Sequence, residues 1–251
     1  MLINLRNGMM GGKRTPTAKD YVQSGLVAMY DGIENAGWGT HDATQNGWVN
    51  LVDGSMPFVF SQSADTYFGN NYLHRSDTSG ALLPNFPIIK ANTTTELLLN
   101  VSADNASTAN ARFMGATTAN RFELDCYSVG VGSAPRMYWR RTGQTSYTTT
   151  YCRFQRTSAW GLWALVMSVD SSGVMTIEDA ITGALWTSGT NTIDLAYYAD
   201  IPAVIGCWAQ ANNVFSQMIC NIHRIARYNK ALTASEIAAN YAIDKARFGL
   251  S

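Results

Sequence analysis

Hydrophobic residues in the middle of the chain recur at every second position, in short runs that polar turns separate. Leu97, Leu99 and Val101 stand on one parity of such a run, and more polar residues stand on the other. Residues 121–127 alternate in the same way, and a similar run over 137–141 follows across a turn. A strand points successive side chains to opposite faces. We therefore predict strands that are buried on one face.

Further runs complete the predicted set of strands. Residues 162–169 are apolar on both parities, which is typical of a central strand covered on both faces. Asp170–Gly173 predicts a hairpin turn into a strand over residues 174–178. Shorter strands are predicted over residues 26–30, 58–60, 203–208 and 215–225. Leu83 to Pro87 is predicted to be a connection, because two prolines do not fit a central strand.

The end of the chain predicts one helix. Thr233 and Glu236 have the spacing of a capping box, so the helix is expected to begin at Ala234. Gly249 supplies a left-handed stop. A mainly apolar stripe should pack the helix onto the preceding strand as a lid, and it consists of Ile237, Tyr241, Ala242, Lys245 and Phe248.

Many short strands with polar turns and a lone helix predict an all-β fold, a double-sheet jelly roll. The chain has 251 residues, which suits one domain of this type. Residues 1–24 show no periodicity and include Gly11-Gly12 and Thr15-Pro16, so they are predicted to be an N-terminal arm or linker before a domain over residues 25–251. The arm is either a loose terminus or a tether to a larger assembly.

The run from Arg227 to Thr233, followed by Glu236-Ile237, resembles the closing signature of concanavalin A-like lectin/glucanase domains of the laminin-G-like type. Residues 25–32 and 48–51 are similar to the first strands of that group. The resemblance spans about residues 25 to 250. It implies a concanavalin A-like jelly-roll β-sandwich with a C-terminal helix, and it says little about the ligand.

Composition narrows the possible partners. Charged residues make up only 14% of the chain, and 18 basic residues balance 18 acidic ones, so no nucleic-acid partner is expected. The surface must then be polar through Thr, Ser, Asn, Gln and Gly, which is common in extracellular and virion β-proteins. No apolar run approaches the roughly 20 residues of a membrane span, so none is expected.

The first residues do not form a secretory signal, because Asn4, Arg6 and Asn7 interrupt the apolar run. The opening from Ile3 to Arg14 is similar to a segment that precedes laminin-G-like domains in proteins resembling phage or prophage products of gut bacteria. This resemblance implies a virion or phage particle as the location. The alternative location is the cytoplasm.

Cofactor chemistry has little support in the sequence. The residues Cys126, Cys152, Cys207 and Cys220 are far apart, so buried thiols are expected rather than a zinc site or disulfides. The loop after residue 30 could form an oxygen-rich calcium site, but the spacing matches no EF-hand and a solvated loop is favoured. The residues concerned are Asp31, Glu34, His41 and Asp42. No cofactor is expected.

The glucanase branch of the resembled family carries its catalytic carboxylates on one strand, as Glu-x-Asp-x-Glu or with one more spacer residue. Glu123-Leu124-Asp125 begins this pattern, but Tyr127 and Ser128 stand where the acid/base is needed. His41, His74 and His223 lie in no recognisable catalytic motif, and Glu178-Asp179 are adjacent and face opposite ways. No enzyme activity is expected.

Candidate sugar-binding residues lie on the strands over 121–127 and 137–141. Flat aromatic rings beside hydrogen-bonding groups suit sugar faces. The candidates share one outward parity: Glu123, Asp125, Tyr127, Tyr138 and Arg140. The alternative is that these tyrosines serve strand packing alone. The tryptophans Trp38, Trp48, Trp160 and Trp163 are assigned to the core or to loop anchoring.

The hypothesis that joins these features is a non-catalytic, lectin-like surface module that binds carbohydrate. It would be a phage or prophage virion-associated or adhesion protein. Its expected partners are a glycan or cell-surface polysaccharide, other virion proteins through the arm, and further copies of itself through exposed strand edges. The alternatives are a purely structural virion subunit and a glycoside hydrolase of the glucanase branch.

Overall fold

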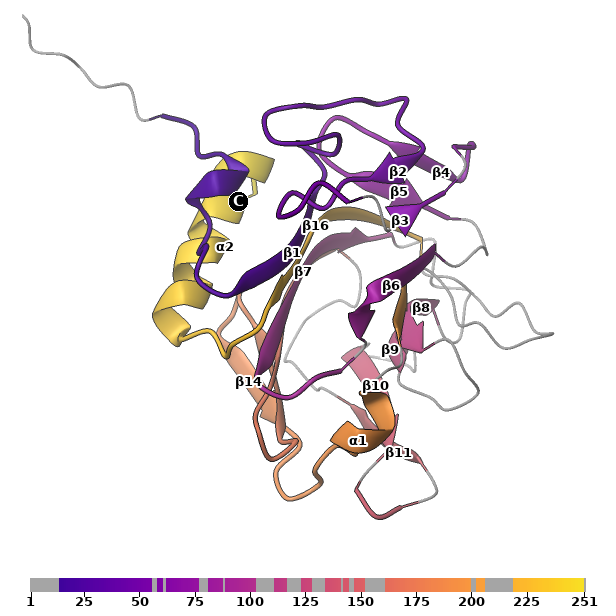
Figure 1. Ribbon diagram of the computed structural model, residues 1–251, viewed down its shortest axis with the longest axis vertical. Helices are drawn as coiled ribbons and strands as arrows, with labels where there is room; N and C mark the ends of the chain where they lie inside the picture. Colours follow the sequence, from indigo (N-terminus) through magenta and orange to yellow (C-terminus); the bar gives the residue numbers. More distant parts are fainter. Residues whose placement is uncertain are drawn as a thin grey trace, which may run out of the picture.

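The computed structural model folds into two large antiparallel sheets, a two-stranded sheet of β2 and β3, and one long helix (Figure 1). It describes residues 14–55, 58–60, 62–76, 81–87, 89–102, 111–116, 123–127, 134–140, 142–144, 147–151, 161–199, 202–205 and 219–250. In strands β6, β8–β11 and β15 it describes the backbone, together with the side chains of Phe113 and Met114. No helix among the described residues is long and apolar enough to span a membrane.

The larger sheet has the order β14-β13-β12-β7-β16-β5-β4, and β1 pairs with β16 outside this path. Its strands are β1 (Leu26–Asp31), β4 (Thr66–Phe68), β5 (Leu73–Arg75), β7 (Thr93–Val101), β12 (Gly161–Val169), β13 (Met175–Asp179), β14 (Ala184–Thr187) and β16 (Cys220–Tyr228).

The smaller sheet has the order β11-β10-β9-β8-β15-β6. Its strands are β6 (Ala81–Pro87), β8 (Ala111–Ala116), β9 (Glu123–Tyr127), β10 (Ala134–Arg140), β11 (Tyr147–Tyr151) and β15 (Pro202–Ile205). The remaining elements are β2 (Gly47–Trp48), β3 (Phe58–Val59), the short helices η1 (Ala18–Asp20) and α1 (Leu195–Tyr198), and the long helix α2 (Ala234–Phe248).

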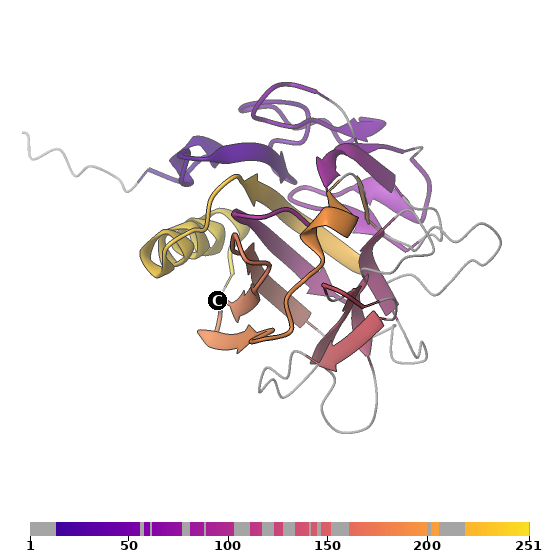
Figure 2. The same cartoon turned by 60° about the horizontal axis from the view of Figure 1, so that its bottom comes forward.

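The main core lies between the two sheets. Leu97, Leu99 and Val101 on β7 belong to the same buried cluster as Phe113 and Met114 on β8. Figure 2 shows α2 on the opposite, outer side of the larger sheet. The predicted all-β sandwich with a C-terminal helix is confirmed.

The strands of the larger sheet are covered on both faces where α2 packs. This confirms the prediction for residues 162–169, whose side chains from Trp163 to Met167 are buried. The prediction that β7 is half-buried is wrong for Glu96 and Leu98, which are 2% and 1% exposed. Both lie under α2 or its C-terminal end, and only Asn100 on that parity remains exposed.

A bulge at His223 explains why the predicted last strand mixes its faces. The pairing of β16 with β7 shifts between Ile222 and Arg224, so one extra residue resets the alternation. Ile222 and Ile225 therefore both reach the main core, while Arg224 turns to the face that α2 covers. A strict period of two would have placed Arg224 in the core.

Two turn predictions have different outcomes. The hairpin at Asp170–Gly173 is confirmed, with the Asp170 carboxylate accepting the amides of Ser172 and Val174. The connection predicted over Leu83–Pro87 is wrong, because these residues belong to β6. Strand β6 lies at the edge of the smaller sheet and its pairing with β15 is irregular, so prolines are tolerated there.

Helix α2 begins and ends as predicted. The Thr233 hydroxyl accepts the amide of Glu236, and the Glu236 carboxylate accepts the amide of Thr233. Gly249 closes the helix with φ of 65°, in the left-handed region. The predicted stripe is only partly right: Ala242 and Lys245 are exposed, and the buried positions include two polar residues, Asn240 and Asp244.

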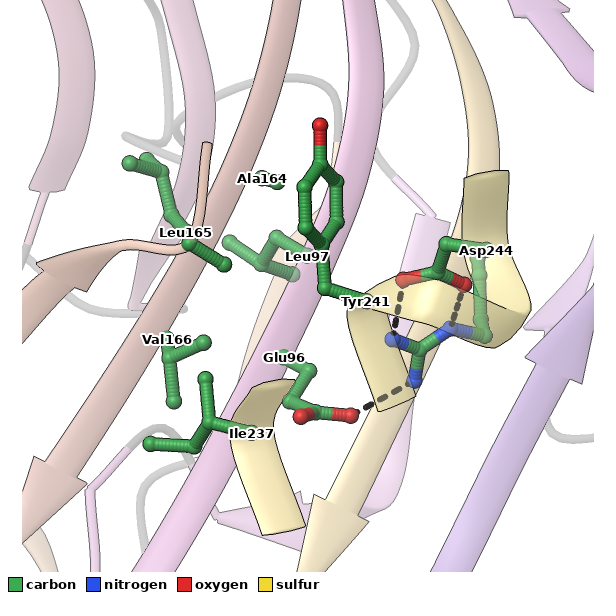
Figure 3. A pocket seen from close by; sticks show the side chains of 10 residues that line it. Glu96, Leu97, Ala164, Leu165, Val166, Ile237, Tyr241 and Asp244 are labelled. Atoms are coloured by element: carbon green, nitrogen blue, oxygen red, sulfur yellow. Dashed lines mark hydrogen bonds and ion pairs between the residues drawn. The ribbon is translucent and has the colours of Figure 1, made fainter. Parts of the chain in front are cut away.

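A buried charge cluster explains those polar positions (Figure 3). Arg224 donates from Nε and Nη2 to both carboxylate oxygens of Asp244 at 2.8 Å, and from Nη1 to Glu96 at 2.7 Å. Asn240 donates to Glu96, and the Tyr21 hydroxyl donates to Asp244 at 2.6 Å. One guanidinium faces two carboxylates here, so it cannot fully offset the cost of burying both. Burial raises the pKa of Glu96, and the charge on Arg224 opposes only part of this rise.

A second ion group holds the loop that follows β1. Arg247 on α2 donates to Asp31 at 3.1 Å and to Glu34 at 3.0 Å, and both carboxylates are buried. The solvated loop favoured from the sequence is therefore wrong for these two residues, although His41 is exposed. Burial raises the pKa of Asp31 to about 6, and Arg247 offsets part of that rise. The described residues contain no group of three metal-ligating side chains.

Part of the predicted arm packs on the domain. Tyr21 is 2% exposed, and its ring centroid lies 4.5 Å from the Arg224 guanidinium carbon. The amide of Val22 donates to Asn240, and that of Ala18 donates to Glu34. The stretch from Ala18 to Val22 is therefore not a free arm, while residues 1–13 lie outside the described part. The division of the chain at Gly25 stays a prediction.

The assignments of cysteine and tryptophan can be checked at some positions. Cys220 is a buried free thiol, and burial raises its pKa to about 12. Trp48 and Trp163 are fully buried, as expected. Trp38 is 37% exposed and lies in a loop against Lys19. Trp160 and the side chains of the other three cysteines lie outside the described part.

Replacing Ile237 with aspartate should cost about 3 kcal/mol or more of unfolding free energy, because it buries an unpaired charge between α2 and the sheet. Denaturant unfolding would measure this cost. Ala239→Asp places the same charge on the exposed side of the helix and should cost far less. Equal stability of the two variants would contradict the docking of α2.

Replacing Arg224 with methionine should cost about 3–5 kcal/mol, because Glu96 and Asp244 would remain buried without their cation. The matched control is Lys245→Met, which removes an exposed cation from α2. Denaturant unfolding of both variants at neutral pH is the measurement. A loss below about 1 kcal/mol for Arg224→Met would show that the cluster contributes little.

Candidate functional site

A row of four aromatic and polar side chains crosses the larger sheet. Cα partners in register are Tyr67 with His74, His74 with Asn221, and Asn221 with Asn100. The four residues come from β4, β5, β16 and β7. Directly opposite residues in antiparallel strands point to the same face. We call this row the groove row.

The groove row faces outward. Leu73, Cys220 and Leu99 precede its members on their strands and belong to the main core, so the groove row takes the other face. This is the face that α2 covers, but the helix ends at Phe248, which packs with Leu98. Asn100 lies one alternation beyond Leu98 and is exposed. The C-terminal end of α2 therefore leaves the row uncovered.

Contacts within the row fix its orientation. The rings of Tyr67 and His74 stack with centroids 4.8 Å apart and an interplanar angle of 28°. His74 Nδ1 lies 2.8 Å from Oδ1 of Asn221. An amide oxygen only accepts, so this hydrogen bond assigns the proton to Nδ1. Asn221 then keeps its amide NH₂ for another partner.

The row lines an open pocket of about 310 Å³. Its other described lining residues are Tyr72, Ser102, Ile219 and Cys220. Apart from the exposed Asn100 and the buried Cys220, these side chains are half-buried. The described lining contains no Asp, Glu, Lys or Arg. The pocket therefore offers rings, amides and hydroxyls rather than charges.

The loop between β4 and β5 places Tyr72 at the pocket. Gly32 approaches this loop so closely that a Cβ there would lie 2.5 Å from the Asn71 carbonyl oxygen. The same carbonyl accepts a hydrogen bond from His223 Nδ1 at 3.0 Å. The His223 ring in turn lies 5.3 Å from that of Phe248 at the end of α2. Burial, with the neighbouring Tyr67, raises the pKa of Tyr72.

The sequence-predicted sugar site lies on the smaller sheet. Glu123 pairs with Tyr138, and Tyr127 pairs with Ala134, so the register gives one parity to five positions: Glu123, Asp125, Tyr127, Tyr138 and Arg140. Met114, which belongs to the main core, pairs with Leu124 on the opposite parity. The side chains of the five residues lie outside the described part. Their role in sugar binding stays a prediction.

Sequence reasoning did not find the groove row. Asn100 stood on the polar parity of a predicted strand, but the other members gave no pattern of their own. Tyr67 and His74 occupy strands of three residues, and 147 residues separate His74 from Asn221. Only the pairing of the strands brings them together. A polar residue between two core residues was the one local sign.

The pocket has no catalytic arrangement among its described residues. It lacks a pair of carboxylates, and the adjacent Glu178 and Asp179 lie elsewhere on β13, with Asp179 buried and bound to Thr182. The three histidines do not gather: His41 is exposed in a loop, while His74 and His223 bond an amide oxygen and a carbonyl. The described geometry suits recognition through rings and hydrogen bonds.

The chain matches no protein-family model and no curated protein. Its similarities are to solved structures. Trypanosoma rangeli sialidase in complex with 2,3-difluoro-KDN aligns with a TM-score of 0.57 at 15% identity, over 90% of this chain and 32% of that one. The Ruminococcus gnavus IT-sialidase CBM40 aligns with a TM-score of 0.51 at 15% identity, over 67% of this chain and 95% of that one.

The same CBM40 bound to α2,3 sialyllactose aligns with a TM-score of 0.50. This chain spans about a third of the length of the sialidases that it matches, since 32% of the first is covered. At 15% identity these similarities establish the fold alone, a β-sandwich shared with sialidase and carbohydrate-binding domains.

The position of His223 gives a testable pH dependence. Burial lowers its pKa from the ordinary value of 6.5, although the Asn71 carbonyl opposes this. Below pH 6.5 the unfolded chain therefore binds more protons, so the contribution of His223 to stability is present above that pH and declines as the pH falls. The unfolding free energy should therefore decrease from about pH 7.5 to about pH 5.5, and the decrease should be larger for the wild type than for His223→Gln. Parallel losses would contradict a buried neutral imidazole.

Proposed function

We propose that this protein is a non-catalytic, lectin-like module that binds glycans. The observation that carries the proposal is the open pocket over the groove row, where Tyr67, His74 and two asparagines stand side by side. The fold supports it, since a similar fold occurs in a carbohydrate-binding module solved with sialyllactose.

The pocket chemistry matches that of a sugar. A pyranose combines apolar C–H faces with a rim of hydroxyls, and each hydroxyl both donates and accepts hydrogen bonds. The rings of Tyr67 and Tyr72 can contact the C–H faces. The amides of Asn100 and Asn221 offer donors and acceptors to the hydroxyls. A mainly polar, half-open pocket suits a ligand that remains partly hydrated.

The finer biological role that we propose is a laminin-G-like domain on a virion or another adhesive surface. The connector from Arg227 to Thr233, the low charge and the phage-like opening of the chain support it. In this role residues 1–13 join the domain to other virion proteins, and the sandwich binds a cell-surface polysaccharide.

The role of residues 1–13 as a tether is tested by measuring the molecular size of the full chain and of a chain beginning at Arg14. Assembly lost with residues 1–13 supports it, and identical sizes contradict it.

The first test of glycan binding is a glycan array with the full chain, followed by calorimetry on the best ligand. Tyr67→Ala should weaken binding about tenfold or more, which corresponds to about 1.4 kcal/mol, because it removes a ring from the pocket. The matched control is Tyr138→Ala on the smaller sheet. Loss in the control alone would move the site to β9 and β10, and the absence of any bound glycan would refute the proposal.

We also expect no hydrolysis of the bound glycan. The described pocket has no carboxylate pair, and the carboxylate pattern that begins at Glu123 and Asp125 is incomplete. Incubation with β-glucans, galactans and host-type glycans should release no reducing sugar. Turnover that disappears in Glu123→Gln would overturn this expectation and favour the glucanase alternative.

A further inference from the structure

We infer that the pocket selects an uncharged saccharide, and that Asn221, held by His74, donates to one of its hydroxyl oxygens. The inference rests on the proposed glycan-binding function and specifies the ligand class of the same pocket. It follows from the lack of charged side chains in the described lining of the pocket, and from the hydrogen bond between His74 and Asn221.

The cations nearest to the row in sequence are turned away or already paired. Arg75 follows His74 on β5, is 1% exposed and takes the opposite, inward parity. Arg224 follows the bulge on β16, and three of its nitrogens bond to Glu96 and Asp244. The carboxylate of an anionic sugar would therefore lose part of its hydration on binding, and no cationic side chain among the described lining residues would pair with it. An uncharged sugar has no such cost.

Asn221 and Asn100 form a pair of adjacent amides, which we call the asparagine pair. Asn221 and Asn100 are direct partners across β16 and β7, so their Cβ atoms lie about 5 Å apart. Each amide can donate and accept. Two amides side by side can serve two neighbouring hydroxyls of one pyranose. A carboxylate would meet a donor from each amide but no positive charge among the described lining residues.

His74 determines which end of the Asn221 amide faces the ligand. Its Nδ1–H donates to Oδ1 at 2.8 Å, which leaves the NH₂ group of Asn221 for the pocket. Tyr67 stacks on the imidazole and holds the ring in this orientation. His74 is therefore a positioning residue for Asn221, and Asn221 is the donor.

The ligand class is tested on an array that carries each neutral glycan beside its sialylated counterpart. Neutral glycans should bind, and addition of sialic acid should not strengthen binding. Affinity for the best neutral glycan should be unchanged between about 50 mM and about 500 mM salt, because no ion pair is formed. Binding of sialylated glycans alone, or a fall in affinity with salt, would overturn the inference and leave glycan binding intact. No binding to either set would refute the proposed function itself.

The donor role is tested with Asn221→Asp, which keeps an acceptor for His74 but removes the NH₂ group. It should weaken binding of the neutral glycan at least tenfold. Asn100→Ala, at an exposed position, should weaken binding as well and should melt with the wild type. If Asn221→Asp unfolds, Asn100→Ala decides the question. Unchanged affinity in that variant would contradict the binding of sugar hydroxyls by the asparagine pair.

The positioning role of His74 has its own readout. His74→Phe keeps a ring against Tyr67 but loses the Nδ1–H, so the affinity should fall several-fold with a smaller binding enthalpy. His74→Gln can donate to Oδ1 of Asn221 again and should recover part of the affinity. In the Asn221→Ala background, His74→Phe should have little further effect. Equal losses in both backgrounds would show that His74 does not act through Asn221.

Discussion

The outer face of the larger sheet depends on one buried cation, the Arg224 guanidinium. It ties a carboxylate on the central strand β7 to a carboxylate on α2, and the ring of Tyr21 covers it. Because charges so deeply buried cannot remain unpaired, the helix has one favourable position on the sheet. That position sets Phe248 against His223, and His223 in turn holds the loop that carries Tyr72. The geometry of the pocket therefore depends on an ion pair outside it.

Features that depend on neighbouring residues could be predicted from the sequence. The cap at Thr233, the stop at Gly249 and the hairpin at Asp170 each need only a few residues, and all three are confirmed. Glu96 could not be placed, because a charged residue on a strand indicates solvent unless its partner is known. Its partner Arg224 lies 128 residues away and faces it only because of the bulge at His223.

The candidate pocket was harder to predict than the fold for the same reason. Each member of the groove row is one residue on its strand, and Tyr67 and His74 come from strands too short to show a period. Hydrophobic patterning determines which residues are buried, but it does not determine which exposed residues become neighbours across strands. The shared face of β9 and β10 could be predicted, because both strands are long enough to show alternation and they follow one another in the sequence.

The prolines of β6 also affect how the molecule meets other copies of itself. The edge strand of a sheet normally presents free backbone N–H and C=O groups, which can recruit a further strand. Proline has no N–H to offer, and β6 carries Pro84 and Pro87 at the end of the smaller sheet. This end is therefore a poor template for strand addition. Two copies of the chain are not expected to join their smaller sheets edge to edge through β6.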